Sequence, residues 1–247
     1  MAKLNPVFSG IKVDEGINTA ATVKGVGSKT LLLFGIAVLS AVLSLTYLAP
    51  VVYGNPATYL LVAIGAVVCG IIGQVNPNAA KVCSIIYSIC EGVVLGLISV
   101  SFEAQISGIV LSAVLLTGTI FGVMLLLYST NIIRVTGRFV RVMSGLALTI
   151  LIVSLVYLIS YLFNPNNILI VALSSNPGIL LLISGFILLY GAFMLVLDFE
   201  QVNMIVAHGF DKKYEWTAAL GLMVTLVWIY VEILRILYII YQMADRN

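Results

Sequence analysis

Charged residues are scarce in this chain of 247 residues, at 9% of the total, and there is a single histidine. Hydrophobic residues make up 62% of the chain, and the mean hydropathy is +1.17. This composition excludes a soluble globular domain and predicts a polytopic membrane protein. The net charge of +2 is too small to indicate a nucleic-acid partner.

Cysteine is also rare, and the three that occur are Cys69, Cys83 and Cys90. They are odd in number and lack the spacing to histidine or to one another that metal sites show, so buried structural thiols are favoured. No stretch outside the apolar segments is long enough for a separate catalytic or binding domain. We therefore expect one membrane domain over 30–243, with a polar cytoplasmic segment over 1–29 and a tail over 244–247.

Seven apolar segments are long enough, at about 20 residues each, to cross a hydrocarbon core about 30 Å thick. They cover 30–49, 56–75, 82–101, 106–129, 140–163, 178–199 and 216–242. Asn-Pro pairs flank several of these segments, where the fixed φ of proline begins a helix without loss of a hydrogen bond. The pairs are Asn55-Pro56, Asn76-Pro77, Asn164-Pro165 and Asn176-Pro177. The predicted fold class is an all-α membrane protein with seven transmembrane helices.

Lysine and arginine alternate strongly between the loops. Ten of them lie before the first segment or in every second loop, and these are Lys3, Lys12, Lys24, Lys29, Lys81, Arg134, Arg138, Arg141, Lys212 and Lys213. The loops around 50–55, 102–105 and 164–177 contain none. Because basic residues are retained on the cytoplasmic side, the pattern predicts a multi-pass protein with its N-terminus in the cytoplasm and its C-terminus outside.

Small residues recur at four-residue steps in three segments, where they would let neighbouring helix backbones approach closely. The longest such stripe is Ser84, Ser88, Gly92 and Gly96. Shorter ones are Gly118 with Gly122, and Ala66 with Gly70. We expect each stripe to contact another helix.

Two acids, Asp198 and Glu232, lie within the last two apolar segments. An ionised acid at the centre of a spanning helix costs roughly 2.5–3.5 kcal/mol, so such residues line a water-filled path, form a proton site or belong to a buried pair. They are the leading candidate site. Glu91, beside the longest stripe, is either a hydrogen-bonded structural acid or part of a path. Glu200 is expected to be a solvated charge at the interface.

Several motifs carry a resemblance to a known family. The segment 213–237, KYEWTAALGLMVTLVWIYVEILRIL, resembles the last helix of the Bax inhibitor-1 family in its bacterial branch. LDFEQ over 197–201 looks like the acidic end of that family's sixth helix, and CEGVVLG over 90–96 looks like its Glu-Gly motif in the third. Segments 5–9 and 23–30 resemble the start of this branch, so the resemblance covers nearly the whole chain.

The resemblance implies a bundle in which spans one to three and four to six wrap around a central seventh span. It also implies a pH-sensitive calcium leak in a bacterial plasma membrane, with Asp198 and Glu232 as a proton-sharing pair and transient calcium site, and no further cofactor. Two nearby carboxylates titrate as a coupled unit. Their oxygens suit calcium, but two are fewer than the roughly six to eight ligands calcium prefers, which suits weak binding.

Arg235 complicates the role of Glu232, because it follows three residues later on the same helix face. The two residues form either a helix-internal ion pair without a transport role or a latch on the acid site. Some relatives latch the acids with an arginine on helix two, but 56–75 contains no basic residue. The depth of Glu232 in the membrane also matters, because a helix over 217–243 would be about 10 Å longer than the hydrocarbon core. Glu232 meets Asp198 only if that excess projects inward.

Enzymatic activity is not expected. An intramembrane serine protease needs a histidine at membrane depth, but the only histidine, His208, falls in a predicted loop. The Gly-x-Gly-Asp motif of a diaspartyl intramembrane protease does not occur. A retinal-type receptor needs a lysine inside the last span, and no lysine lies inside a span core. Two other functions remain open. The two three-helix halves and their acids would suit a proton-coupled carrier. The family also implies a stress regulator that binds another membrane protein, such as a membrane protease. The expected partners are the lipid bilayer, calcium and protons.

Overall fold

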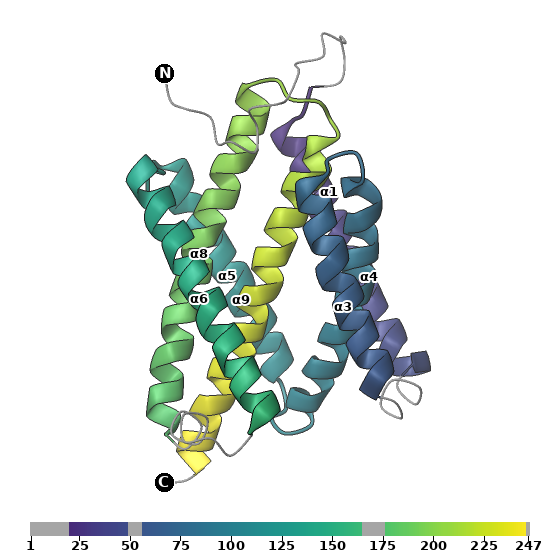
Figure 1. The fold of residues 1–247 in the computed structure, drawn as a ribbon, viewed down its shortest axis with the longest axis vertical. Helices are drawn as coiled ribbons and strands as arrows, with labels where there is room; N and C mark the ends of the chain where they lie inside the picture. The colour runs from purple at the N-terminus through teal and green to yellow at the C-terminus, as the bar shows by residue number, and fades with distance from the viewer. Residues whose placement is uncertain (1–19, 49–55, 165–175, 246–247) are drawn as a thin grey trace.

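The computed structural model describes residues 20–48, 56–164 and 176–245 (Figure 1). Within them, seven helices are long and apolar enough to cross a membrane, which confirms the predicted fold class. The elements are α1 (Val23–Leu43), its π-helical continuation η2 (Ser44–Leu48), α3 (Pro56–Val75), α4 (Ala80–Glu103), α5 (Ile109–Ser129), α6 (Gly137–Phe163), α8 (Pro177–Ala207) and α9 (Tyr214–Asp245).

Helix α9 runs through the middle of the bundle, as Figure 1 shows, with α1, α3 and α4 on one side and α5, α6 and α8 on the other. It packs against α1, α3, α4, α5 and α8, and it is the most buried of the seven spans. Helix α6 packs mainly on α8 and is the least buried. The predicted arrangement of two three-helix halves around a central last helix is confirmed.

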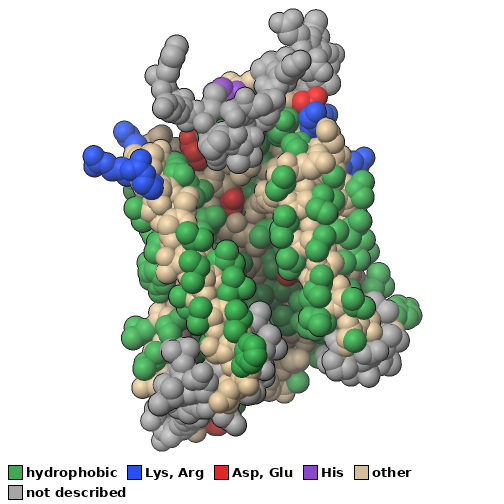
Figure 2. Space-filling view, viewed as in Figure 1, with side chains coloured by type: hydrophobic (Ala, Val, Ile, Leu, Met, Phe, Trp, Pro, Cys, Tyr) green, Lys and Arg blue, Asp and Glu red, His purple; other side chains and the backbone are tan. Residues whose placement is uncertain are grey.

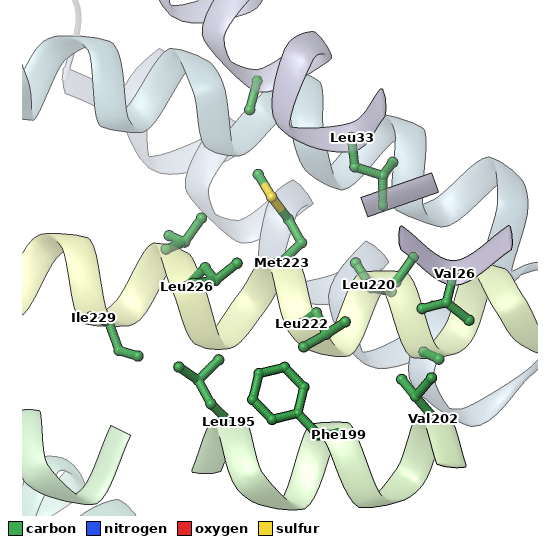
Figure 3. Close-up of a cluster of buried hydrophobic side chains, with 14 of the residues drawn as sticks. Val26, Leu33, Leu195, Phe199, Val202, Leu220, Leu222, Met223, Leu226 and Ile229 are labelled. Carbon is green, nitrogen blue, oxygen red and sulfur yellow. The ribbon is translucent and has the colours of Figure 1, made fainter. Parts of the chain in front are cut away.

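Apolar side chains from both halves interlock around α9 (Figure 3). Helix α8 directs Leu195, Phe199 and Val202 toward α9, and α1 contributes Val26 and Leu33 from the other half. Because lipid tails are as apolar as these side chains, close van der Waals packing rather than exclusion of water holds such helices together. The core therefore fixes which faces of α8 and α9 meet.

Helix α8 begins where the Asn-Pro pattern predicts. The side-chain oxygen of Asn176 accepts hydrogen bonds from the backbone N–H groups of Gly178 (3.0 Å) and Ile179 (3.3 Å), and Pro177 occupies the first turn. This arrangement satisfies helix N–H groups that have no partner within the helix. Pro56 likewise opens α3, and Asn164 caps the end of α6.

Two helices extend beyond a predicted end by seven or more residues. Helix α1 begins at Val23 rather than at residue 30, because the Thr22 hydroxyl accepts a hydrogen bond from the Gly25 N–H at 2.9 Å and starts the helix there. Helix α8 continues to Ala207, eight residues beyond the predicted end. Hydropathy detects the part of a helix that lies in lipid, whereas the helix itself extends into the polar interface.

The longest small-residue stripe makes the expected helix contact. A Cβ atom on Gly92 would clash with the Ala37 carbonyl oxygen and lie 2.9 Å from the Ser40 Cβ, and one on Gly96 would lie 3.0 Å from the Ala41 carbonyl oxygen. The α1 backbone therefore approaches α4 as closely as glycine allows. In α3, Ala66 is buried and a Cβ on Gly70 would lie 3.4 Å from the ring of Tyr87.

The corresponding prediction for α5 is wrong. A Cβ on Gly118 or Gly122 would meet nothing within 4 Å. Helix α5 instead buries the face that carries Ala113, Thr117 and Met124. Four-residue spacing of glycines marks a possible contact face, but which face is buried depends on where the neighbouring helices lie.

We expect Gly92→Ala to destabilise the protein by about 1–3 kcal/mol, because the added methyl group forces α1 and α4 apart. Thermal unfolding of the purified protein in detergent measures the change. Gly118→Ala is the matched control, since it adds the same methyl group to open space and favours the helix slightly. Equal melting temperatures for the two variants would contradict the close α1–α4 contact.

Candidate functional site

Asp198 lies on α8 at the edge of the face that packs on α9. The hydroxyl of Thr225, on α9, donates a hydrogen bond to its carboxylate. The second carboxylate oxygen, Oδ2, is buried and has no hydrogen-bond partner among the described residues. The residue as a whole is half-buried. A buried carboxylate oxygen without a partner is uncommon in folded proteins, and a bound water or ion is one explanation for it.

A third helix reaches the same point. A Cβ atom on Gly221 of α9 would lie 3.7 Å from Asp198 Oδ1 and 3.3 Å from the side-chain nitrogen of Gln74, which comes from α3. Any larger side chain at position 221 would crowd both groups. We call Asp198, Gln74, Gly221 and Thr225 the Asp198 site. Its carboxylate, amide and hydroxyl oxygens are the ligand types that hard cations prefer.

Glu232 has a different partner. Its Oε2 atom lies 3.5 Å from Nη1 of Arg235, so the predicted i,i+3 contact is present. The Glu232 residue is only 3% exposed, whereas the Arg235 side chain is 55% exposed. The other oxygen, Oε1, is buried without a hydrogen-bond partner in the described part of the chain. Arg235 thus neutralises one side of an acid that is otherwise enclosed.

The structure does not bring Asp198 and Glu232 together. Glu232 follows Thr225, the partner of Asp198, by seven residues, which is about 10 Å of helix rise. Asp198 lies near the last third of α8, while Glu232 lies past the middle of the antiparallel α9. The two acids therefore occupy different depths in the bundle.

The other two acids considered from the sequence lie outside the Asp198 site. Glu91 is half-buried midway along α4, with Tyr59 and Tyr87 nearby, and it makes no hydrogen bond or ion pair with the described residues. A path-lining role for Glu91 stays a prediction. Glu200 is not a freely solvated charge as expected, because it is half-buried and accepts a hydrogen bond from the Tyr128 hydroxyl at 2.8 Å.

A buried acid at the start of α9 was not predicted. Glu215 is fully buried and accepts hydrogen bonds from the backbone N–H (2.8 Å) and hydroxyl (3.2 Å) of Thr22. It also forms an ion pair with Lys29 of α1. We call Glu215, Thr22 and Lys29 the Glu215 clamp. It joins the first helix to the last, and a side chain on Gly25 would clash with it.

Nothing near Glu215 in the sequence indicates this role. An acid in the first turn of a helix is common, because it interacts favourably with the helix dipole. Its ionic partner is 186 residues away, and the neighbouring Ala21 N–H donates to the Phe210 carbonyl oxygen at 2.8 Å. Only the packing of α1 against α9 brings these groups together.

A comparison with protein families decides the class of this bundle. A family model described as Bax inhibitor 1 like matches residues 5–242. The chain belongs to this family. Comparisons with curated proteins and with solved structures gave no match. The match to the Bax inhibitor 1 like family confirms the resemblance inferred from the motifs, and it extends over all seven spans up to the last turn of α9.

We expect Lys29→Met to destabilise this Bax inhibitor 1 like protein by about 3–5 kcal/mol, because it leaves Glu215 buried without its ionic partner. The melting temperature in detergent measures the loss. Lys24→Met is the matched control, since Lys24 lies exposed in the same first turns of α1 and has no such partner in the described residues. If both variants melt alike, the clamp does not stabilise the fold.

Proposed function

We propose that this protein is a pH-sensitive cation leak channel of the membrane, not an enzyme, with calcium as the ion and the Asp198 site as its ion and proton site. One observation carries the proposal. A carboxylate lies inside an apolar bundle with one oxygen facing a hydroxyl and the other buried without a partner among the described residues. Acids at membrane depth that are not fully paired are typical of ion and proton pathways.

The same group can serve both purposes. When ionised, Asp198 offers negative charge next to the Thr225 hydroxyl, with the Gln74 amide close to the same glycine, Gly221, and this set of groups suits a hard cation. When protonated, it loses that charge and becomes a hydrogen-bond donor. The four side-chain oxygens of Asp198, Gln74 and Thr225 are fewer than the roughly six to eight that calcium prefers, so binding is weak and transient, as a leak requires. Within this proposal, Glu232 acts at its own depth rather than by sharing a proton with Asp198.

We further propose that the protein lies in a bacterial plasma membrane with its N-terminus in the cytoplasm and its C-terminus outside. In Figure 2 the lysine and arginine side chains in view gather at one end of the bundle, which we call the basic end. Helices α1 and α9 begin there, with Lys24 in the first turn of α1 and Lys213 directly before α9. Retention of basic residues in the cytoplasm supports this orientation, which fusions of a reporter to either terminus would test.

We expect Asp198→Asn to abolish the pH dependence of calcium flux, because an amide cannot titrate. Wild-type protein in liposomes loaded with a calcium indicator should leak at rates that differ several-fold between about pH 5.5 and pH 8, while the rates of the variant stay equal. Glu200→Gln is the matched control, since it removes an acid two residues away that contacts Tyr128 instead. It should retain the pH response.

Other outcomes would select other functions. Flux that keeps its full pH response in Asp198→Asn would remove this acid from the mechanism. Saturable uptake driven by a proton gradient would indicate a carrier. No flux under any condition, together with a membrane protease that co-purifies with the protein, would favour a regulator that acts by binding.

A further inference from the structure

One face of α9 carries a row of mostly small, hydroxylic or charged residues over 217–235. Residues at spacings of four, four, three, four and three fall within an arc of about 80°, since each residue turns the helix by about 100°. They are Thr217, Gly221, Thr225, Trp228, Glu232 and Arg235, and we call them the α9 stripe. Every member except Trp228 is small, hydroxylic or charged, on a helix that is otherwise strongly apolar.

Two members of the stripe have buried atoms that lack protein partners. Thr217 is 5% exposed and Glu232 is 3% exposed, and neither Thr217 Oγ1 nor Glu232 Oε1 has a hydrogen-bond partner among residues the structure describes. Asp198 Oδ2, which faces the same helix between them, is in the same condition. Buried polar atoms of this kind are generally hydrogen-bonded to water. Their repetition along one face indicates water along that face.

The stripe lies at the seam between the two halves of the bundle. Gln74 of α3 meets it from one side, and Asp198 of α8 meets it from the other. Figure 2 shows that the surface is hollowed between these halves, with carboxylate side chains visible inside the hollow and α9 behind it. Thr217, Thr225 and Glu232 are themselves buried, so the stripe lies inside the bundle at this seam.

An aromatic contact interrupts the stripe. Trp228, one turn beyond Thr225 and one turn before Glu232, packs edge-on against Tyr190 of α8, with ring centroids 5.5 Å apart. Tyr190 is 4% exposed, and its hydroxyl donates to the Met143 carbonyl oxygen of α6 at 3.4 Å. The two rings thus form a supported apolar barrier between the depth of Asp198 and the depth of Glu232.

We infer that the α9 stripe is the wall of a water-filled path for cations. Asp198 is the cation site nearer the basic end, and Glu232 with Arg235 is the site nearer the opposite end. The Trp228–Tyr190 contact is the constriction that closes the path between these two sites. Apolar constrictions of this kind block ions by excluding water. This inference rests on the proposed leak function. It adds the route that the cation takes along α9 and the barrier that closes this route, neither of which follows from the Asp198 site alone.

Flux through the barrier provides the first test. Trp228→Ala should raise calcium flux in proteoliposomes by about tenfold at the pH where wild type is slowest, while Trp228→Phe, which keeps a ring, should raise it little. Phe139→Ala is the matched control, because it removes a ring that packs on Phe193 between α6 and α8, away from the stripe. Equal flux in Trp228→Ala and Phe139→Ala, with both folded by their melting curves, would overturn the constriction.

Accessibility to a membrane-impermeant thiol reagent provides a second test that needs no flux. The native cysteines are first replaced by alanine, and single cysteines are placed at 217, 225, 232 and, as a control buried on the opposite face, 226. Applied from the basic end, the reagent should label 217 and 225 but neither 226 nor 232. Adding Trp228→Ala should raise labelling at 232 at least tenfold.

The outcomes separate the path from the leak function. Labelling at 217 and 225 no faster than at 226 would overturn the water-filled path, even if flux depends on pH through Asp198. Labelling at 232 that does not change with Trp228→Ala would overturn the barrier. Conversely, the expected labelling pattern in a protein without any calcium flux would support the path and reject the proposed leak.

Discussion

A polar group at membrane depth needs a partner or water, and α9 carries several such groups through the centre of an apolar bundle. The protein meets this constraint differently at three levels. At the basic end, Glu215 is fully buried with an ion pair and two hydrogen bonds. Farther along, Asp198 and then Glu232 are each satisfied on one oxygen only, within the described residues. The carboxylates therefore have fewer hydrogen-bond and ion-pair partners with distance from the basic end, along the part of α9 where we place the path.

The arrangement of the halves explains why these groups gather on α9. The two halves meet each other mainly through α9, with smaller contacts between α4 and α5 and between α1 and α8. A seam of this kind lets one face of the central helix remain polar, since α3 and α8 flank it without packing extensively on each other. The other faces of α9 bury apolar side chains such as Leu220, Met223 and Leu226, and this packing keeps the helix in the core despite its polar face.

Much of the fold could be predicted because lipid restricts the possibilities. Apolar runs of spanning length, Asn-Pro pairs and the stripe around Gly92 each correspond to a physical requirement of the bilayer or of close packing. The depth of the acids could not be predicted, because hydropathy identifies the helix on which a residue lies but not the register of that helix against its neighbours. Thr225 carries no charge, so nothing in the sequence marked it rather than Glu232 as the partner of Asp198.

The same reasoning applies to Gly118 and to Glu215. The glycine has the spacing of a packing motif, but among the described residues no atom lies within 4 Å of a Cβ placed on it. Glu215 resembles an ordinary interfacial acid until α1 is placed beside it. Contacts between segments far apart in the chain determine whether Gly118 packs on a neighbour and which residue pairs with Glu215. Such contacts cannot be predicted from the local pattern of a single sequence.

The Glu215 clamp also has a consequence for biogenesis. Lys29 enters the membrane region with the first helix, yet the carboxylate that neutralises it belongs to the last one, 186 residues later. During synthesis, α1 therefore waits at the interface with an unpaired ammonium group while five further spans are inserted. When α9 packs into the bundle, the ion pair between Lys29 and Glu215 forms. A chain that lacks the final helix therefore keeps the Lys29 ammonium group without this carboxylate partner.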